Sequence, residues 1–162
     1  MTRNIELSDY TPQWAEAYKQ EAICLKTLLG RETVRIHHIG STAIPNIKAK
    51  PVIDMLIEVL SIKKLDTLNE RFKTAGYEIK GECGIPGRRF FQKGTSQPTY
   101  HVHAYQTKHP EIARHLHFRD ILLTNTTIAK EYERLKIHLA SIYHTDRLSY
   151  TEGKSAFIRS IE

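Results

Sequence analysis

The sequence predicts an α+β domain in which a mixed β-sheet of about five strands is flanked by helices and extended by C-terminal helices. Segments with strand and helix periodicity alternate through the first two thirds of the chain, and the last third carries only helical patterns. The 162 residues are 40% hydrophobic and can enclose one core. No Pro-, Gly- or Ser-rich stretch divides them, so we expect a single domain over residues 1–162.

The first predicted elements are a helix and two strands. Thr11 and Pro12 can cap a helix over residues 12–29, which Gly30 ends. The pattern next predicts strands over 34–39 and 51–59, a helix over 63–74 that ends before Gly76, and a strand over 77–80.

The remaining elements are two strands followed by helices. The strands are expected over 88–93 and 99–105, joined by a Gly-, Ser- and Pro-containing turn. Pro110 can open a helix that reaches residues 121–123, and further helices are expected over 128–142 and 150–161.

The composition favours anionic small molecules as ligands. The net charge is +6 and the pI is about 9.3, but the bases are spread along the chain. RNA binding stays possible but is less favoured, because no RNA-recognition motif is present. No apolar run is long enough for a membrane span, so we expect a cytoplasmic protein. Cys24 and Cys83 have no metal-binding spacing, and we assign them no role.

Gly40 and Ser41 follow the strand expected over 34–39. Glycine allows a tight turn, after which backbone amides and the Ser41 hydroxyl can face an anion such as phosphate. The alternative is an ordinary turn. Lys50, shortly before the next strand, is a second candidate phosphate contact.

Asp54 is the one acid at the start of an otherwise apolar strand. A carboxylate in such surroundings is costly unless it is paired, hydrogen-bonded or bound to a cation, so Asp54 is a candidate base or metal ligand. The alternative is a structural ion pair with Arg88 or Arg89. Glu58 shares its strand face, but its Cα lies roughly 13 Å away at ~3.3 Å per residue, too far to replace a neighbouring acid.

His101 and His103 share one face of their predicted strand. Two residues apart, their Cα atoms are separated by ~6.6 Å, so both imidazoles can reach one ion. Together with Asp54 they form a candidate site for one divalent metal, with Mn²⁺ or Zn²⁺ preferred over Mg²⁺ because imidazole is a ligand. The alternative is a solvated strand face. We expect these three residues to share one cleft with Gly40 and Ser41.

Arg88, Arg89 and Lys93 are candidate substrate contacts. Guanidinium groups match phosphate oxygens in a bidentate manner. In a regular strand Arg88 and Arg89 point to opposite faces, so only one of the two can enter the cleft. Lys93 lies on the same strand face as Arg89. The alternative is a role in surface solubility.

Four segments in this order and spacing resemble the GrpB family: HIGSTAIPNIKAKPVIDMLIEV, GRRFFQKG, HVHAY and HFRDILLTN. The resemblance covers nearly the whole chain. It implies membership of the nucleotidyltransferase superfamily, with a fold shared with DNA polymerase beta. A GrpB-like domain also occurs fused to dephospho-CoA kinase in some bacteria.

The superfamily pattern is only partly present. It consists of a hydrophobic residue, Gly, and Gly or Ser, then acid-x-acid on a strand and a third acid on a later strand. Gly40, Ser41 and Asp54 match, but Leu56 stands at the second acid, which argues against two-metal catalysis. Histidine is expected at the place of the third acid.

Three functions follow. The first is an enzyme that transfers a nucleotidyl group or acts on another phosphorylated small molecule, using Asp54 and the two histidines around one divalent ion. The second is a non-catalytic module of the same fold that binds a nucleotide or a CoA-like anion. The third is an RNA-binding protein, which ranks last.

Overall fold

The structure, a computed structural model, describes residues 4–162 and confirms the α+β class. The first half contains α1 (Gln13–Leu29), β1 (Thr33–Ile39), β2 (Val52–Val59), α2 (Ile62–Asp66), α3 (Asn69–Thr74) and β3 (Tyr77–Gly81). The second half contains β4 (Arg89–Lys93), β5 (Thr99–Gln106), α4 (Pro110–Thr124), α5 (Thr126–Ile142) and α6 (Arg147–Ser160). Two 3-10 turns, η1 (Gly30–Glu32) and η2 (Ser41–Ala43), flank β1.

The five strands form one mixed sheet in the order β1-β2-β5-β4-β3. β2 and β5 run parallel at its centre, and the other neighbouring pairs are antiparallel. The register places Asp54 of β2 beside Ile39 of β1 and beside His101 of β5. This pairing brings the end of β1 and the starts of β2 and β5 together at one end of the sheet.

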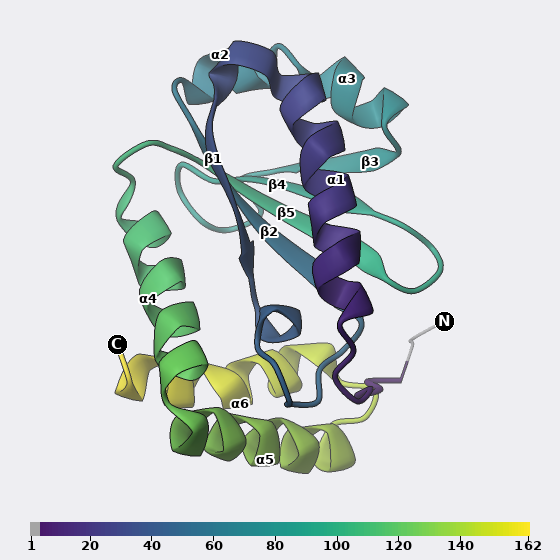
Figure 1. Cartoon of the computed structure of the whole chain (residues 1–162), viewed down its shortest axis with the longest axis vertical. Helices are drawn as coiled ribbons and strands as arrows, with labels where there is room; N and C mark the ends of the chain where they lie inside the picture. Colours follow the sequence, from purple (N-terminus) through teal and green to yellow (C-terminus); the bar gives the residue numbers. More distant parts are fainter. Residues whose placement is uncertain (1–3) are drawn as a thin grey trace.

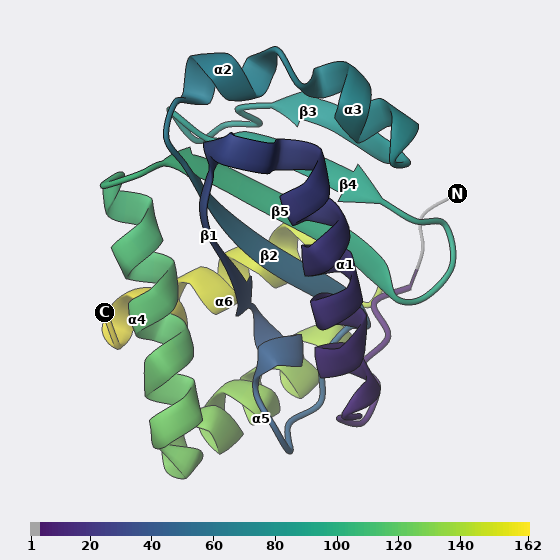
Figure 2. The same ribbon diagram turned by 45° about the horizontal axis from the view of Figure 1, so that its top comes forward.

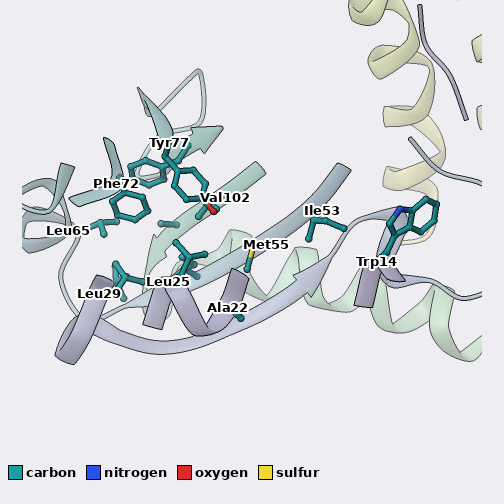
Figure 3. Packing of buried hydrophobic residues seen from close by; sticks show 14 of the residues in the cluster. Trp14, Ala22, Leu25, Leu29, Ile53, Met55, Leu65, Phe72, Tyr77 and Val102 are labelled. Atoms are coloured by element: carbon teal, nitrogen blue, oxygen red, sulfur yellow. The ribbon is translucent and has the colours of Figure 1, made fainter. Parts of the chain in front are cut away.

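One face of the sheet carries the main hydrophobic core. Odd-numbered residues of β2 point toward α1, α2 and α3 and meet buried side chains of those helices (Figures 1 and 3). Phe72 of α3 stacks on Phe91 of β4 with ring centroids 3.9 Å apart. This face is therefore closed by packing, and polar residues of β2 are left for the other face.

The opposite face is covered in part by α4, whose Ile112 packs against Leu56 and Tyr105. In Figure 2, α1 passes in front of the sheet and α6 passes behind it. Helices α5 and α6 lie together beyond the end of β1 (Figure 1). They lie at the end of the sheet where Asp54 and His101 are found.

The segment between β1 and β2 is fastened to α5. Buried Lys136 donates to the carbonyl of Lys48 at 2.6 Å, and Ile44 and Ile47 pack against Tyr132. Helix α6 packs closely on α5 because Gly153 has no side chain: a Cβ there would lie 2.6 Å from a methyl of Leu139. The C-terminal helices are thus held at fixed positions beside the site.

One predicted element was wrong. The single helix expected over 63–74 is two short helices, α2 and α3. The hydroxyl of Thr67 donates to the carbonyl of Lys64 at 2.6 Å, and the amide of Leu68 bonds to Leu65 three residues back. This local bonding replaces the i to i−4 pattern and interrupts the helix. The other predicted helices and strands are present, with ends shifted by up to three residues.

Both cysteines, Cys24 and Cys83, are free thiols at the protein surface. Among the described residues, none of the helices combines the length and apolar character that crossing a membrane requires.

Candidate functional site

The turn after β1 places glycine directly against Asp54. Gly40 has φ +73°, and a Cβ at this position would lie 2.6 Å from Oδ2 of Asp54. Only glycine fits this conformation and this close approach. Thr42 fixes the turn to the start of β2, since its buried hydroxyl donates to the carbonyl of Val52 at 3.0 Å and accepts from His38 Nε2 at 3.0 Å.

Ser41 begins the 3-10 turn η2 and contacts α5. A hydrogen bond with Ser41 is among the influences on the phenol of Tyr132, which is buried. Burial raises the pKa of Tyr132, and the neighbouring Tyr150 and Asp54 raise it further, while Ser41 opposes the shift. Ser41 and Tyr132 therefore link the turn after β1 to α5, and Asp54 lies near enough to Tyr132 to influence its pKa.

Both predicted histidines face the same oxygen of Asp54. Nε2 of His103 lies 3.2 Å from Oδ1, and Nδ1 of His101 lies 3.8 Å from it. Burial alone would raise the pKa of Asp54, but the hydrogen bond with His103 and nearby basic groups, His101 among them, hold it below its ordinary value. Asp54 is therefore a carboxylate at neutral pH.

Arg88 lies behind His103, before β4 rather than within it as the strand boundary predicted. Its Nη1 lies 3.4 Å from Nδ1 of His103. Arg88 is 9% exposed, so its guanidinium is held inside the protein. Of the two neighbouring arginines, Arg88 is thus the one on the Asp54 side of the sheet.

As they are arranged, Asp54, His101 and His103 do not fit a three-ligand metal centre. A metal-binding nitrogen must offer a lone pair. The guanidinium of Arg88 has only donors, so the nitrogen of His103 toward Asp54 carries the proton instead. Within residues 4–162, no group of three or more His, Cys, Asp or Glu side chains has an arrangement that could hold a metal ion. The Mn²⁺, Zn²⁺ or Mg²⁺ ion expected from the sequence is therefore no part of the function proposed for this site.

Three cations gather on the other side of Asp54. Lys50 and Lys154 of α6 place their ammonium groups 5.2 and 4.6 Å from the ring centre of Tyr150. Burial lowers the pKa of Lys154 to about 8, with Lys50 adding to the shift and Asp54 opposing it. Burial also lowers the pKa of Lys50, and Arg147 contributes in the same direction.

A cleft of about 540 Å³ is lined by two of these cations, Lys50 and Arg147, and by the acid Glu6, whereas Lys154 and Asp54 lie outside its lining. Lys50, His101 and Arg147 line it together with Gln92 of β4, whose amide nitrogen lies 3.5 Å from Nε2 of His101. The volume lies within the range of roughly 300–1,000 Å³ that is usual for small-molecule sites. The cleft can therefore admit a ligand of nucleotide size beside His101, whose Nδ1 lies 3.8 Å from Oδ1 of Asp54.

Two predicted phosphate contacts, Arg89 and Lys93, form ion pairs with acids of helices on the other face of the sheet. Arg89 donates from Nε to Asp66 of α2 at 2.7 Å. Lys93 borders the cleft, but its ammonium pairs with buried Glu21 of α1 at 2.5 Å. The structure therefore brings Gly40, Ser41, Lys50, Asp54, Arg88, His101 and His103 together and leaves the charged groups of Arg89 and Lys93 outside.

Glu58 and Leu56 lie on the same face of β2 as Asp54. Glu58 lies 3.4 Å from His37, at the far end of the strand from the cleft. Leu56 is fully buried between Ile39 and Tyr105. The position of the second acid is thus occupied by hydrophobic core.

Together, the mixed sheet and the Gly-Ser turn beside the acid of β2 define a nucleotidyltransferase-like fold. Residues 4–162 match the GrpB protein family, and the chain belongs to that family. UPF0157 protein YqkA of Bacillus subtilis is 49% identical over 99% of this chain. The chain spans 47% of the length of that relative. Glutamate-rich protein GrpB of Alkalihalophilus pseudofirmus is 36% identical over 96% of this chain and 92% of its own length.

Solved structures support the same assignment. The crystal structure of conserved protein GrpB from Enterococcus faecalis has a TM-score of 0.91 and 43% identity, and covers 96% of this chain and 94% of that chain. The Cid1 poly(U) polymerase has a TM-score of 0.56 at 12% identity, over 82% of this chain and 44% of its own, which shows a shared fold alone. Dephospho-CoA kinase of Mycobacterium leprae is 38% identical over 41% of this chain and 18% of its own length.

Sequence reasoning missed the contribution of the C-terminal helices. Tyr132, Arg147, Tyr150 and Lys154 were not among the predicted site residues. One signal was available: Tyr150 and Lys154 are four residues apart and therefore share one face of their helix. Nothing in the sequence showed that this face would meet Lys50.

Proposed function

We propose that the cleft beside Asp54 binds a phosphorylated small molecule, and that a nucleotide is the ligand class the fold favours. The proposal rests on three cations, Lys50, Lys154 and Arg147. In residues 4–162, none of the ion pairs includes any of them. Unpaired, half-buried ammonium groups that repel each other are stabilised by a bound anion, and phosphate supplies several charged acceptor oxygens.

The tyrosines beside the lysines support an oxygen-rich ligand. The hydroxyl of Tyr150 is buried and has no hydrogen-bond partner within the described chain. It lies near enough to Tyr132 to raise the pKa of that phenol. A buried donor without a partner is costly, and a ligand oxygen that reached it would remove this cost.

Asp54 adds a second recognition element. Its Oδ2 faces Gly40 and accepts none of the hydrogen bonds that the described residues make, while Oδ1 faces the histidines. Oδ2 can therefore accept a hydrogen bond from a ligand hydroxyl. In nucleotidyl transfer, such a hydroxyl would lose its proton to Asp54 as its oxygen attacks the α-phosphorus and pyrophosphate leaves.

A second candidate is a non-catalytic module that binds the same ligands. It is favoured by Leu56, which is fully buried where the superfamily pattern has its second acid. One carboxylate can hold a ligand hydroxyl but does not form the two-metal arrangement of the superfamily. An RNA-binding role stays less favoured, because Lys50 and Arg147 line a cleft of small-molecule size.

A thermal-shift panel tests ligand binding. Inorganic phosphate, inorganic triphosphate, nucleoside triphosphates, the parent nucleosides and coenzyme A are each added to the full chain. A ligand at about 100 times its Kd stabilises by ~2.7 kcal/mol, which raises the Tm by roughly 5–10 °C for a chain of this size. We expect this shift with phosphorylated compounds and none with nucleosides.

The matched variants are Lys50→Gln/Lys154→Gln and Lys19→Gln/Lys63→Gln. Both remove two positive charges, but Lys19 and Lys63 are exposed on helices of the other face. The first pair should lose the shift and the second should keep it. An equal response of both pairs would mean that the anions bind elsewhere.

Binding should also depend on the protonation of Lys154. Its pKa is lowered to about 8, and a bound phosphate favours the charged form and therefore raises it. Affinity for inorganic triphosphate should be constant below about pH 8 as far as Lys154 is concerned, and should decline as the pH rises above that value. Lys154→Arg, which stays charged, should abolish the decline. Calorimetry from pH 7 to pH 9.5 measures both, and an unchanged decline in Lys154→Arg would show that another group titrates.

A further inference from the structure

The guanidinium of Arg88 is buried without an acidic partner. Its Nε donates to the carbonyl of Glu82 at 3.1 Å and its Nη2 to that of Cys83 at 2.7 Å. It also lies 4.8 Å from the ring centre of Phe90. In the described chain no carboxylate pairs with it directly, although a buried charge is expensive without compensation.

The remaining nitrogen of this guanidinium faces His103. Nη1 lies 3.4 Å from Nδ1 of His103, and the other ring nitrogen lies 3.2 Å from Oδ1 of Asp54. A guanidinium always donates, so Nδ1 must be the acceptor and Nε2 must carry the proton. The hydrogen bond made by one ring nitrogen sets the tautomer of the other.

From this geometry we infer that Arg88 and His103 are positioning residues that turn Asp54 into a receptor for a ligand hydroxyl. Arg88 holds His103 as the Nε2–H tautomer, and His103 occupies Oδ1 of Asp54. Oδ2 is then the oxygen left free, facing the Gly40 turn. The inference rests on the proposed function for the ligand, which must carry a hydroxyl near its phosphate groups, as a ribose or another phosphorylated alcohol does.

This arrangement differs from a metal centre in one respect. With Arg88 in place, His103 offers Asp54 a proton and offers no lone pair to a cation. Removing the guanidinium would free the imidazole to exchange its tautomer. Arg88 therefore selects hydroxyl recognition over metal ligation at Asp54.

The first test is the tautomer itself in the ligand-free wild-type chain. Two-bond ¹H–¹⁵N correlation spectra distinguish the protonated from the unprotonated ring nitrogen, and His103→Gln assigns the signals. We expect a single Nε2–H tautomer for His103. A predominant Nδ1–H tautomer, or rapid exchange between the two, would overturn the inference. The result does not depend on whether any phosphorylated ligand binds, so it separates this inference from the proposed function.

The second test is Zn²⁺ binding measured by calorimetry. Arg88→Met keeps an apolar stem against Phe90 and removes every donor. It should raise the Zn²⁺ affinity about tenfold or more, the scale on which hydrogen-bond partners of histidine ligands act, and His103→Gln in the same chain should cancel the gain. Wild-type Zn²⁺ binding that His103→Gln weakens would contradict the inference.

A third variant guards against a purely structural role for Arg88. Arg88→Lys keeps the charge but has no fork that can reach two loop carbonyls and His103 together. We expect Arg88→Lys and Arg88→Met to show mixed tautomers for His103 in the folded state. A retained Nε2–H tautomer in folded Arg88→Met would show that Arg88 does not set it.

Discussion

Asp54→Asn should greatly slow any transfer chemistry of the cleft while leaving phosphate binding intact or tighter. The change keeps the shape of the side chain and removes its charge, so a ligand hydroxyl has no base to receive its proton. General-base catalysis contributes roughly 10²–10⁴-fold, and we expect a rate loss of this size. The affinity for inorganic triphosphate should not fall, because a carboxylate repels phosphate. Assays of nucleotidyl transfer and calorimetry of triphosphate measure the two effects.

The matched control is Glu58→Gln, which removes a carboxylate from the same face of β2. Glu58 lies beside His37 and away from the cleft. Its substitution should leave both measurements within twofold of wild type. If both variants lost activity equally, the acid that receives the proton would not be Asp54.

Gly40→Ala should disrupt both the fold and the site. At φ +73° an alanine is strained, and its Cβ would overlap Oδ2 of Asp54. Backbone strain of this kind costs on the order of 1–3 kcal/mol, and displacement of the carboxylate adds to it. From the strain alone we expect the Tm to fall by roughly 2–12 °C, given about 2–4 °C per kcal/mol for a chain of this size.

Gly30→Ala separates strain from contact. Gly30 also has positive φ, at +59°, but a Cβ there would have no heavy atom within 4 Å. It should show the strain alone and keep triphosphate binding, whereas Gly40→Ala should lose more stability and weaken binding as Asp54 moves. Identical behaviour of the two glycine variants would argue that the contact with Asp54 has no consequence.

The sequence was sufficient for most of the fold because each strand and most helices have local signals. The Gly40 turn, the apolar run around Asp54 and the alternation of His101 and His103 each predicted a position that the structure confirms. The break at Thr67 was missed because a side-chain hydrogen bond overrides a continuous helical pattern there.

The site was harder to predict because its parts come from distant segments. Arg88 was placed within a strand, and its contact with His103 depends on the loop that follows β3. Lys154 lies on α6, which approaches α5 closely at Gly153, and Lys136 ties α5 to the segment before β2. These contacts are long-range, so periodicity along the chain does not report them.

The central claim is that Lys50, Lys154 and Asp54 form a site for a phosphorylated small molecule. It is tested most directly by calorimetric titration of the full chain at pH 7.5. A nucleoside triphosphate, the corresponding nucleoside and inorganic triphosphate are the three ligands. We predict one site for each phosphorylated ligand and no measurable heat from the nucleoside. Binding should be at least about 100-fold weaker in Lys50→Gln/Lys154→Gln, since each of the two charged hydrogen bonds contributes ~1.5–3 kcal/mol. Equal affinity in wild type and this double variant, or a nucleoside that binds as tightly as its triphosphate, would contradict the account.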